Sequence, residues 1–351
     1  MPSATLLYIK KSEDNDFLRG YIYLNVLVTG GAGYIGSHTC VVLLNAGHNV
    51  IVADNLCNSR FETIDKVKQI TNKEVIFYQI DVTEDAAVAV IFSNHKIDAV
   101  IHFAGLKAVG ESVEKPLVYY YNNIVSTIIL TKACQKYGVK KIIFSSSATV
   151  YGENEIPFIE SMKLLPTTNP YGETKVMSER ILMDVVNADT ALAVSLLRYF
   201  NPIGAHESGL IGEAPNGIPN NLMPYITQVA QKKLDKLKVF GNDYPTVDGT
   251  GVRDYIHVMD LAEGHVAALD HLTAGVHIYN LGTGQGTSVL QLTKAFEEAN
   301  GVEIPYVIVD RRPGDIAECY ADVSKAESKL NWKAKRGIVD MCLDAWRFES
   351  K

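Results

Sequence analysis

A glycine-rich turn between an apolar strand and a helix most constrains the fold of this chain. Residues Asn25–Thr29 have the apolar, β-branched character of a buried strand, and they lead directly into the glycine-rich stretch Gly30–Gly36. Helical spacing of apolar residues follows over 37–44, and a second apolar strand covers Asn49–Asp54. A strand, a crossing helix and a second strand form one βαβ unit, so the sequence predicts a parallel sheet.

Strands and helices keep alternating further along the chain. Further strands are expected at 75–80, 99–103, 140–144, 191–197 and 277–281, and helices at 117–137, 171–186, 222–233 and 288–300. Strands that are apolar on both faces need helices on both sides of the sheet. The sequence therefore predicts an α/β fold, a Rossmann-type doubly wound parallel sheet with a smaller C-terminal α/β domain.

Changes in composition along the chain also indicate where the domains divide. Residues 1–24 precede the first strand and are expected to form a loosely ordered N-terminal extension. The larger domain is expected at 25–198. After it, 199–256 is rich in Gly, Pro, Asn and Asp, so a second domain is expected at 199–351. The two domains are expected to be interleaved, with the strand near His277 returning to the first sheet.

Composition excludes several classes of protein. The net charge is −7, which argues against a general binder of nucleic acid or of anionic membranes, and no apolar run approaches the roughly 20 residues of a membrane span. The 5 cysteines are widely spaced without a CxxC motif, which is typical of reduced thiols in the cytoplasm. The 9 histidines form no metal-binding pattern, and we expect His102 and His257, beside apolar runs, to be structural.

The glycine-rich turn has the spacing of a dinucleotide-binding fingerprint. Gly30 permits the tight turn, Gly33 allows close approach of a pyrophosphate, and Gly36 allows the helix to pack on the strand. Asp54 ends the second strand about 20 residues later, where a carboxylate binds ribose hydroxyls and repels a 2′-phosphate. This pattern predicts NAD, not NADP, as cofactor. Asp81 also ends a strand, and either contacts the adenine end of the cofactor or caps a helix.

A tyrosine and a lysine lie at the start of a later predicted helix. Tyr171 and Lys175 are four residues apart and therefore share one helix face. A nearby ammonium favours the phenolate of Tyr171, which can then remove a hydroxyl proton while a hydride leaves the same carbon. Ser147, after an earlier strand, can hold the reacting oxygen. A Tyr-x-x-x-Lys pair occurs often by chance, but the glycine fingerprint, the acid, the serine and the pair in this order predict an enzyme.

With these residues the chain resembles the extended short-chain dehydrogenase/reductase family and, within it, the UDP-galactose 4-epimerases. The resemblance runs from Asn25 almost to the end of the chain and excludes 1–24. Its matching blocks are Val28–Thr39, Asp54–Ser59, His102–Ser112, Phe144–Gly152, Leu197–Pro202, Pro219–Pro224, Phe240–Thr246 and Gly249–Leu261.

The resemblance implies individual roles. Tyr171 is implied as general base, Lys175 as its partner and a ribose ligand, and Ser147 as the hydroxyl-binding residue. Further implied cofactor contacts are Tyr34, Ile35, Asn55, Asn58, Ser59, Val82, Phe103, Ala104, Gly105, Lys107, Asn122 and Phe200. The implied UDP-sugar site comprises Asn201, Asn221, Leu222, Phe240, Arg253, Tyr255, Arg312 and Asp315.

The chemistry of the implied UDP-sugar site agrees with this assignment. Arg253 and Arg312 suit a diphosphate, and Phe240 could form a wall for uracil. An ordinary ion pair of Arg253 with Asp254 or Asp260 is the alternative.

The family further implies an isomerase that interconverts UDP-galactose and UDP-glucose. The sugar is oxidised at C4 by a tightly held NAD, turns over as a 4-keto intermediate, and is reduced on its other face. A homodimer through the helices at 117–137 and 171–186 is also implied. Cys319 stands where some epimerases carry Tyr, which suggests additional room for N-acetylated UDP-sugars. Alternatively, Cys319 is simply a small buried residue.

Proteins of the same fold also have other activities. A sugar-nucleotide 4,6-dehydratase needs an acid beside the hydroxyl-binding serine, but Ala148 and Thr149 follow Ser147. A decarboxylase of the same family and an ordinary dehydrogenase with net hydride transfer are further alternatives. A non-enzymatic NAD-binding sensor would generally lack the Tyr171 and Lys175 pair.

Overall fold

A parallel sheet forms the centre of the molecule in the computed structural model, which describes residues 23–216, 219, 221–312 and 314–351. Residues 1–22 of the predicted extension lie outside this description. The sheet has 7 strands in the order β10-β6-β5-β4-β1-β2-β3, and every neighbouring pair is parallel. Their bounds are β1 (Asn25–Thr29), β2 (Asn49–Asp54), β3 (Ile76–Gln79), β4 (Ala99–His102), β5 (Lys141–Ser147), β6 (Ala193–Tyr199) and β10 (Gly275–Leu281). The predicted doubly wound sheet is confirmed.

The strand order reverses between β1 and β4, and this reversal locates a crevice at the carboxyl ends of the strands. The connections after β1 and β4 run in opposite directions across the sheet, so the two loops separate and leave room for a ligand. Strand β10, which contains His277, pairs with β6 along its whole length and extends the sheet at one edge.

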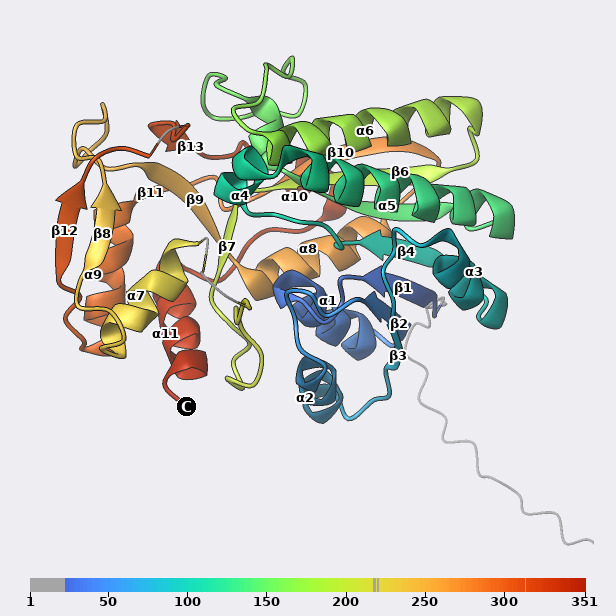
Figure 1. Ribbon diagram of the computed structural model, residues 1–351, viewed down its shortest axis with the longest axis horizontal. Helices are drawn as coiled ribbons and strands as arrows, with labels where there is room; N and C mark the ends of the chain where they lie inside the picture. The colour runs from blue at the N-terminus through green and yellow to red at the C-terminus, as the bar shows by residue number, and fades with distance from the viewer. Residues whose placement is uncertain (1–22, 217–218, 220, 313) are drawn as a thin grey trace, which may run out of the picture.

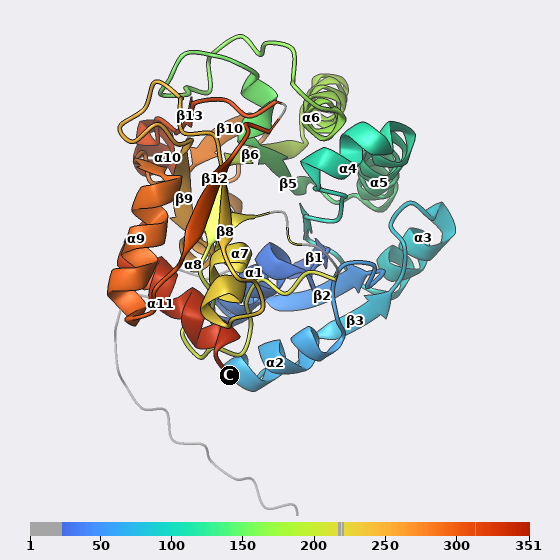
Figure 2. The same ribbon diagram turned by 60° about the vertical axis from the view of Figure 1, so that its left-hand side comes forward.

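Helices cover both faces of the sheet, as Figures 1 and 2 show. Helices α1 (Tyr34–Asn45) and α8 (Val258–Asp270) pack on one face with the inward residues of β1 and β2. The opposite face carries α3 (Asp85–Asn94), α5 (Pro116–Tyr137) and α6 (Pro170–Ala188). Both faces of the strands are buried, which explains their nearly continuous apolar sequences. The shorter helices α2 (Glu62–Thr71) and α4 (Val109–Glu114) lie beside α1 and α5.

A smaller lobe lies at one end of the sheet (Figure 1). Its core is formed by side chains of α7, α9, α11, β8 and β9. Strand β9 pairs with β11, β13 and β7, and β8 pairs with β12. The bounds in this part of the chain are β7 (Asn201–Ile203), α7 (Leu222–Ala230), β8 (Leu237–Phe240), β9 (Val252–His257), β11 (Gly286–Ser288), α9 (Val289–Asn300), β12 (Tyr306–Val309), β13 (Glu318–Cys319), α10 (Ser324–Leu330) and α11 (Ile338–Glu349).

Two differences from the predicted elements have clear physical reasons. Helix α7 ends at Ala230 instead of 233 because Lys232 adopts a left-handed backbone with φ 60°. Helix α8 was not predicted, and it contains Gly264, a poor helix former. The missing side chain is useful there, because an added Cβ would be only 3.1 Å from Leu281 and Trp332. Among the described residues, no helix is long and apolar enough to cross a membrane.

Candidate active site

A single large cleft runs between the carboxyl ends of the sheet strands and the smaller lobe. Its volume is about 2030 Å³, roughly twice the upper end of the 300–1,000 Å³ usual for one small-molecule site. Every residue that the sequence predicted for catalysis, cofactor binding or substrate binding lines this cleft. The cleft is therefore large enough for two nucleotide-sized ligands, and the predicted residues lie together in it.

The glycine-rich turn forms part of the cleft wall and has no room for a side chain at Gly30 or Gly36. Gly30 has a φ of +71°, and a Cβ there would be 2.8 Å from the amide nitrogen of Ala104. A Cβ on Gly36 would be 2.2 Å from the carbonyl oxygen of Gly30. Helix α1 starts after Gly33 without a side-chain cap and without an acidic residue in its first turn. Its first amide groups are therefore available to an anion, which fits the pyrophosphate of a dinucleotide.

Asp54 holds the end of β2 against the glycine-rich turn. Its carboxylate accepts hydrogen bonds from the amide of Ala32 at 3.0 Å, the amide of Leu56 at 2.9 Å and the hydroxyl of Ser59 at 2.8 Å. This contact fixes the position of the carboxylate at the rim of the cleft. The residue can therefore offer its remaining lone pairs to ribose hydroxyls.

Asp81 lies beside Asn55 in the same part of the cleft. Its carboxylate accepts hydrogen bonds from the Asn55 amide at 3.0 Å and from the backbone amide of Thr83 at 2.9 Å. Helix α3 begins at Asp85 with Glu84 as its N-cap, so the predicted alternative that Asp81 caps a helix is wrong. Asp81 stabilises a turn that faces the cleft.

The predicted Tyr/Lys pair occupies the first two turns of α6. Asn169 caps the helix by accepting the Gly172 amide at 2.9 Å, and Pro170 occupies the first turn. Tyr171 therefore sits at the positive end of a 19-residue helix, where a negative charge is stabilised. The Nζ atom of Lys175 lies 5.8 Å from the ring centroid of Tyr171 and donates to the carbonyl of Ser145 at 2.6 Å.

Burial shifts the pKa values of Tyr171 and Lys175 in opposite directions. It raises the pKa of Tyr171 to about 12, while the polar contact with Ser147 works the other way. Burial lowers the pKa of Lys175 to about 8, and a neighbouring carboxylate, that of Glu179, opposes this. The lysine remains mostly protonated at neutral pH. Its positive charge then favours the phenolate once a ligand excludes water from the cleft.

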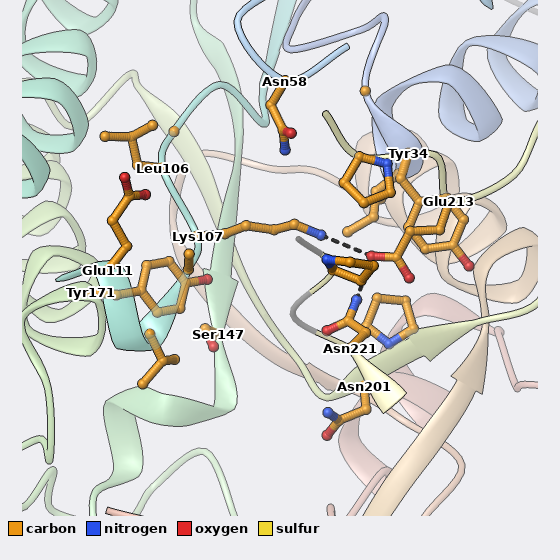
Figure 3. Close-up of a pocket in the computed structure, with 18 of the residues that line it drawn as sticks. Tyr34, Asn58, Leu106, Lys107, Glu111, Ser147, Tyr171, Asn201, Glu213 and Asn221 are labelled. Atoms are coloured by element: carbon orange, nitrogen blue, oxygen red, sulfur yellow. Dashed lines mark hydrogen bonds and ion pairs between the residues drawn. The ribbon is translucent and has the colours of Figure 1, made fainter. Parts of the chain in front are cut away.

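Ser147 lies at the end of β5 with its hydroxyl turned toward the cleft. Its Oγ accepts a hydrogen bond from Thr149 Oγ1 at 3.0 Å. Figure 3 shows Tyr171 and Ser147 on one side of the cleft, with Asn201 and Asn221 on the other. A hydroxyl between these two groups of residues could contact both Tyr171 and Ser147.

Two arginines and an aromatic ring form the wall of the smaller lobe. The Arg312 guanidinium lies over the Phe240 ring, 4.7 Å from its centroid, and its Nε is 3.0 Å from Asp315. A nitrogen of Arg253 is 3.8 Å from the same carboxylate. The pair of cations suits a diphosphate, and Asp315 keeps both guanidinium groups in place.

The predicted alternative for Arg253 is wrong, because neither acid named for it pairs with it. Asp254 is buried and accepts hydrogen bonds from Thr283, and Asp260 forms an ion pair with Arg336. The acid that lies beside Arg253 is Asp315, which comes much later in the sequence. Arg253 lines the cleft.

Sequence reasoning missed Glu213. This carboxylate accepts hydrogen bonds from Lys107 Nζ at 3.2 Å and Asn221 Nδ2 at 2.6 Å, so it connects two predicted ligand-binding residues across the cleft (Figure 3). It stands in an irregular Gly- and Pro-rich segment without a motif, and its partners come from other elements. A buried acid facing the cleft could be found only in the folded structure.

The two histidines expected to be structural have protein partners. His102 is buried with Nδ1 2.7 Å from the hydroxyl of Thr29, and burial lowers its pKa to about 3. The Nε2 atom of His257 is 3.2 Å from Asp344. Among the residues that the structure describes, no group of three His, Cys, Asp or Glu side chains could hold a metal ion.

The sheet, the glycine-rich turn and the Ser/Tyr/Lys constellation define an extended short-chain dehydrogenase/reductase. A family model described as GDP-mannose 4,6 dehydratase matches residues 27–345. A UDP-glucose 4-epimerase of Bacillus subtilis is 62% identical over 327 residues, which cover 93% of this chain and 96% of that protein. A UDP-glucose 4-epimerase of Pasteurella multocida is 60% identical, with 93% and 97% covered.

Solved structures give the same result. UDP-glucose 4-epimerase from Bifidobacterium longum, in complex with NAD+ and UDP, is 56% identical with a TM-score of 0.91, covering 93% of this chain and 98% of that one. The enzyme from Stenotrophomonas maltophila, with bound NAD and formylated UDP-arabinopyranose, is 49% identical with a TM-score of 0.90 and the same coverage. The chain belongs to the family whose model is described as GDP-mannose 4,6 dehydratase and, within that family, to the UDP-glucose 4-epimerases.

Proposed function

We propose that this protein is an isomerase that interconverts UDP-galactose and UDP-glucose by reversible oxidation at C4 of the hexose. The observation that carries the proposal is one continuous cleft with the glycine-rich turn at one end and Arg253 and Arg312 at the other. The Tyr171 and Lys175 pair opens onto the same cleft. The names of the relatives and the ligands in the solved structures support it.

The cleft suits NAD as the resident cofactor. The glycine-rich turn and the uncapped start of α1 fit a pyrophosphate, and the carboxylate of Asp54 fits the adenosine ribose and disfavours a 2′-phosphate. When bound, NAD supplies a reversible hydride acceptor beside C4 of the sugar. Lys107 and Lys175 also line the cleft and are proposed to contact the cofactor.

The residues of the chain then handle the proton and the position of the sugar. Tyr171 removes the proton from the 4-hydroxyl, and Ser147 holds the oxygen on which the 4-keto group forms. Lys175 keeps the tyrosine ionised by its charge. Arg253 and Arg312 hold the diphosphate while the hexose turns over and presents the opposite face of C4 for return of the hydride. Tyr171 then gives the proton back to the oxygen on C4.

One assay tests this function. The purified protein is incubated with UDP-galactose without added NAD, and the products are separated and quantified. We expect UDP-glucose without net NADH, because the hydride is returned to the sugar. Stoichiometric NADH would instead indicate an ordinary dehydrogenase, and loss of water from the sugar would indicate a dehydratase.

The residues beside Ser147 do not favour a dehydratase or a decarboxylase. Elimination of water from the sugar needs an acid at this position, but Ala148 is apolar and the hydroxyl of Thr149 is bound to Ser147. Decarboxylation would need a hexuronic acid as substrate, and the named relatives are epimerases of neutral sugars. An NAD-binding sensor without activity would not need the Tyr171 and Lys175 pair.

The cleft is also proposed to accept UDP-N-acetylglucosamine and UDP-N-acetylgalactosamine. Cys319 lies on β13 and lines the cleft. Its side chain is small, and it is neutral because burial raises the pKa of the thiol to about 12. We expect Cys319→Tyr to lower kcat/KM for the acetylated sugars at least about tenfold, because the larger ring fills the space of the acetyl group.

The matched measurement for this prediction uses UDP-galactose with the same variant. We expect its kcat/KM to change only a few-fold, and Cys319→Ala should keep activity on both sugars. Equal losses on acetylated and unacetylated substrates in Cys319→Tyr would contradict a role in selecting the sugar.

A homodimer through α5 and α6 is proposed as the assembled form. Helix α5 carries exposed apolar side chains, with Leu117 81% and Tyr121 62% exposed. Apolar residues gathered on one helix are typical of a subunit interface. We expect Leu117→Glu/Tyr121→Glu to produce monomers in size-exclusion chromatography with light scattering. Val247→Glu, at a residue 76% exposed outside α5, should leave the dimer intact.

We place the protein in the cytoplasm and divide it into an NAD-binding domain at 25–198 and a UDP-sugar-binding domain at 199–351. All 5 cysteines are free thiols, which suits a reducing compartment. The return of β10 to the sheet supports domains that are partly interleaved.

A further inference from the structure

Glu179 is a buried acid on the catalytic helix that the mechanism above does not use. Tyr171, Lys175 and Glu179 follow one another at intervals of four residues, so they share one face of α6. Glu179 is fully buried and lies behind Lys175, away from the cleft lining. It therefore cannot contact substrate or cofactor directly.

The carboxylate of Glu179 has a fixed geometry. Arg198 on β6 donates to it twice, from Nε at 2.9 Å and from Nη2 at 2.6 Å, and Ser146 Oγ donates at 2.6 Å. Arg198 is itself buried and lies 4.9 Å from the centroid of the Tyr151 ring. The acid and its partner form a bidentate ion pair between the sheet and α6.

Stability alone is a weak explanation for this pair. Burying two charges costs several kcal/mol per ion, and a buried ion pair often adds nothing over an apolar pair of similar size. A charge placed here does, however, act on its neighbours in a medium of low dielectric constant. Its nearest functional neighbour on the helix is Lys175.

The groups around Lys175 are otherwise neutral or positive. Tyr171 is on the same helix, Tyr199 and Arg198 are on β6, and His102 is on β4, where burial keeps it neutral. Glu179 is the acid of this set. It is also the group that opposes the lowering of the Lys175 pKa by burial.

We propose that Glu179 is a positioning residue that keeps a negative charge one turn behind Lys175, fixed by Arg198, so that the ammonium stays protonated and Tyr171 stays active. Three consecutive serines of β5 support this organisation, because each of them contacts one residue of the Tyr171, Lys175 and Glu179 series. The carbonyl of Ser145 accepts from Lys175, Ser146 donates to Glu179, and Ser147 contacts Tyr171. The proposal rests on the proposed function of Tyr171 and Lys175.

The direction of the pH effect follows from the sign of the charge. A carboxylate near an ammonium raises the pKa of the ammonium, so removing it lowers the pKa of Lys175 below its value of about 8. The lysine would then lose its proton at a lower pH. The alkaline limb of the pH profile, where kcat/KM falls as Lys175 loses its proton, should therefore also move to lower pH.

The test is the pH profile of kcat/KM for UDP-galactose, measured on the NAD-loaded enzyme. In Glu179→Gln we expect the alkaline limb to shift down by about one pH unit, which lowers kcat/KM about tenfold on that limb. Ser146→Ala is the matched control, because it removes a hydrogen bond to Glu179 and keeps both charges. Its alkaline limb should stay at the wild-type pH.

A second variant covers the case in which an unpaired Arg198 prevents folding. Glu179→Gln/Arg198→Met removes both charges, and its limb should lie between those of wild type and Glu179→Gln. If the limb stays at the wild-type pH in whichever of the two variants folds, with activity lowered equally at every pH, the role is structural and the proposal is wrong. Failure of the proposed function is distinct, because the wild-type enzyme would then show no epimerisation.

Discussion

Replacing Tyr171 by phenylalanine is expected to lower kcat for the conversion of UDP-galactose by about 10²–10⁴-fold, the usual contribution of a general base. KM should change only a few-fold. The substitution removes one oxygen atom and leaves the ring, so the helix and the cleft keep their shape. The proposed diphosphate ligands, Arg253 and Arg312, line the wall of the smaller lobe, which the substitution does not touch.

The size of this effect follows from the surroundings of the tyrosine. Its hydroxyl lies near Ser147, at the positive end of α6 and one turn from the Lys175 ammonium. These three features all favour the ionised form of Tyr171. Water admitted to the site would be a far weaker base than a positioned phenolate.

Tyr119→Phe provides the matched control. Tyr119 also lines the cleft, but its hydroxyl is engaged by the protein, since it donates to Glu111 and accepts from the amide of Ala108. We expect its kcat to remain within about tenfold of wild type, since the two hydrogen bonds that are lost, of about 0.5–1.5 kcal/mol each, join protein groups and do not involve the reacting oxygen. A Tyr171→Phe enzyme that kept half of its kcat would contradict the proposed mechanism.

The parts of the fold and site that the sequence predicted are those with local signals. Strands such as Asn25–Thr29 are apolar on both faces, and the glycines of the turn are needed by a backbone with no space for a Cβ. The Tyr171 and Lys175 pair could be recognised because four residues of helix place both side chains on one face. Each of these features is encoded within one element or one turn.

The remaining features depend on contacts between distant parts of the chain. Strand β13 is two residues long and exists because Glu318 and Cys319 pair with β9 more than sixty positions earlier. Glu213 acquires its place in the site from Lys107 and Asn221, which belong to other elements. The partner of Glu179 is likewise on a neighbouring strand. A single sequence contains no local pattern that specifies such pairs.

Gly36→Val is expected to abolish retention of NAD and with it most of the activity without added cofactor. A Cβ at this position would lie 2.2 Å from the carbonyl oxygen of Gly30 and 2.8 Å from the Cα atom of Gly31. Both contacts are with backbone atoms, which cannot rotate away as a side chain can. Helix α1 would have to move away from the turn, and its first amides would leave the pyrophosphate position.

The same substitution should also lower the stability of the protein, by about 1–3 kcal/mol, the usual cost of overpacking. Bound nucleotide released by denaturation measures NAD retention, and thermal unfolding with and without added NAD measures stability. Gly337→Ser is the control, because it lies at the N-cap of α11 and an added Cβ would be 3.9 Å from its nearest neighbour, Asp340.

We expect the control to keep its NAD and its melting temperature, since serine is a favourable N-cap residue. A folded Gly36→Val enzyme that still contained NAD at wild-type occupancy would show that the turn tolerates a side chain. The glycine-rich turn would then not be the element that fixes the cofactor, and the close approach of strand β1 to helix α1 would serve packing alone.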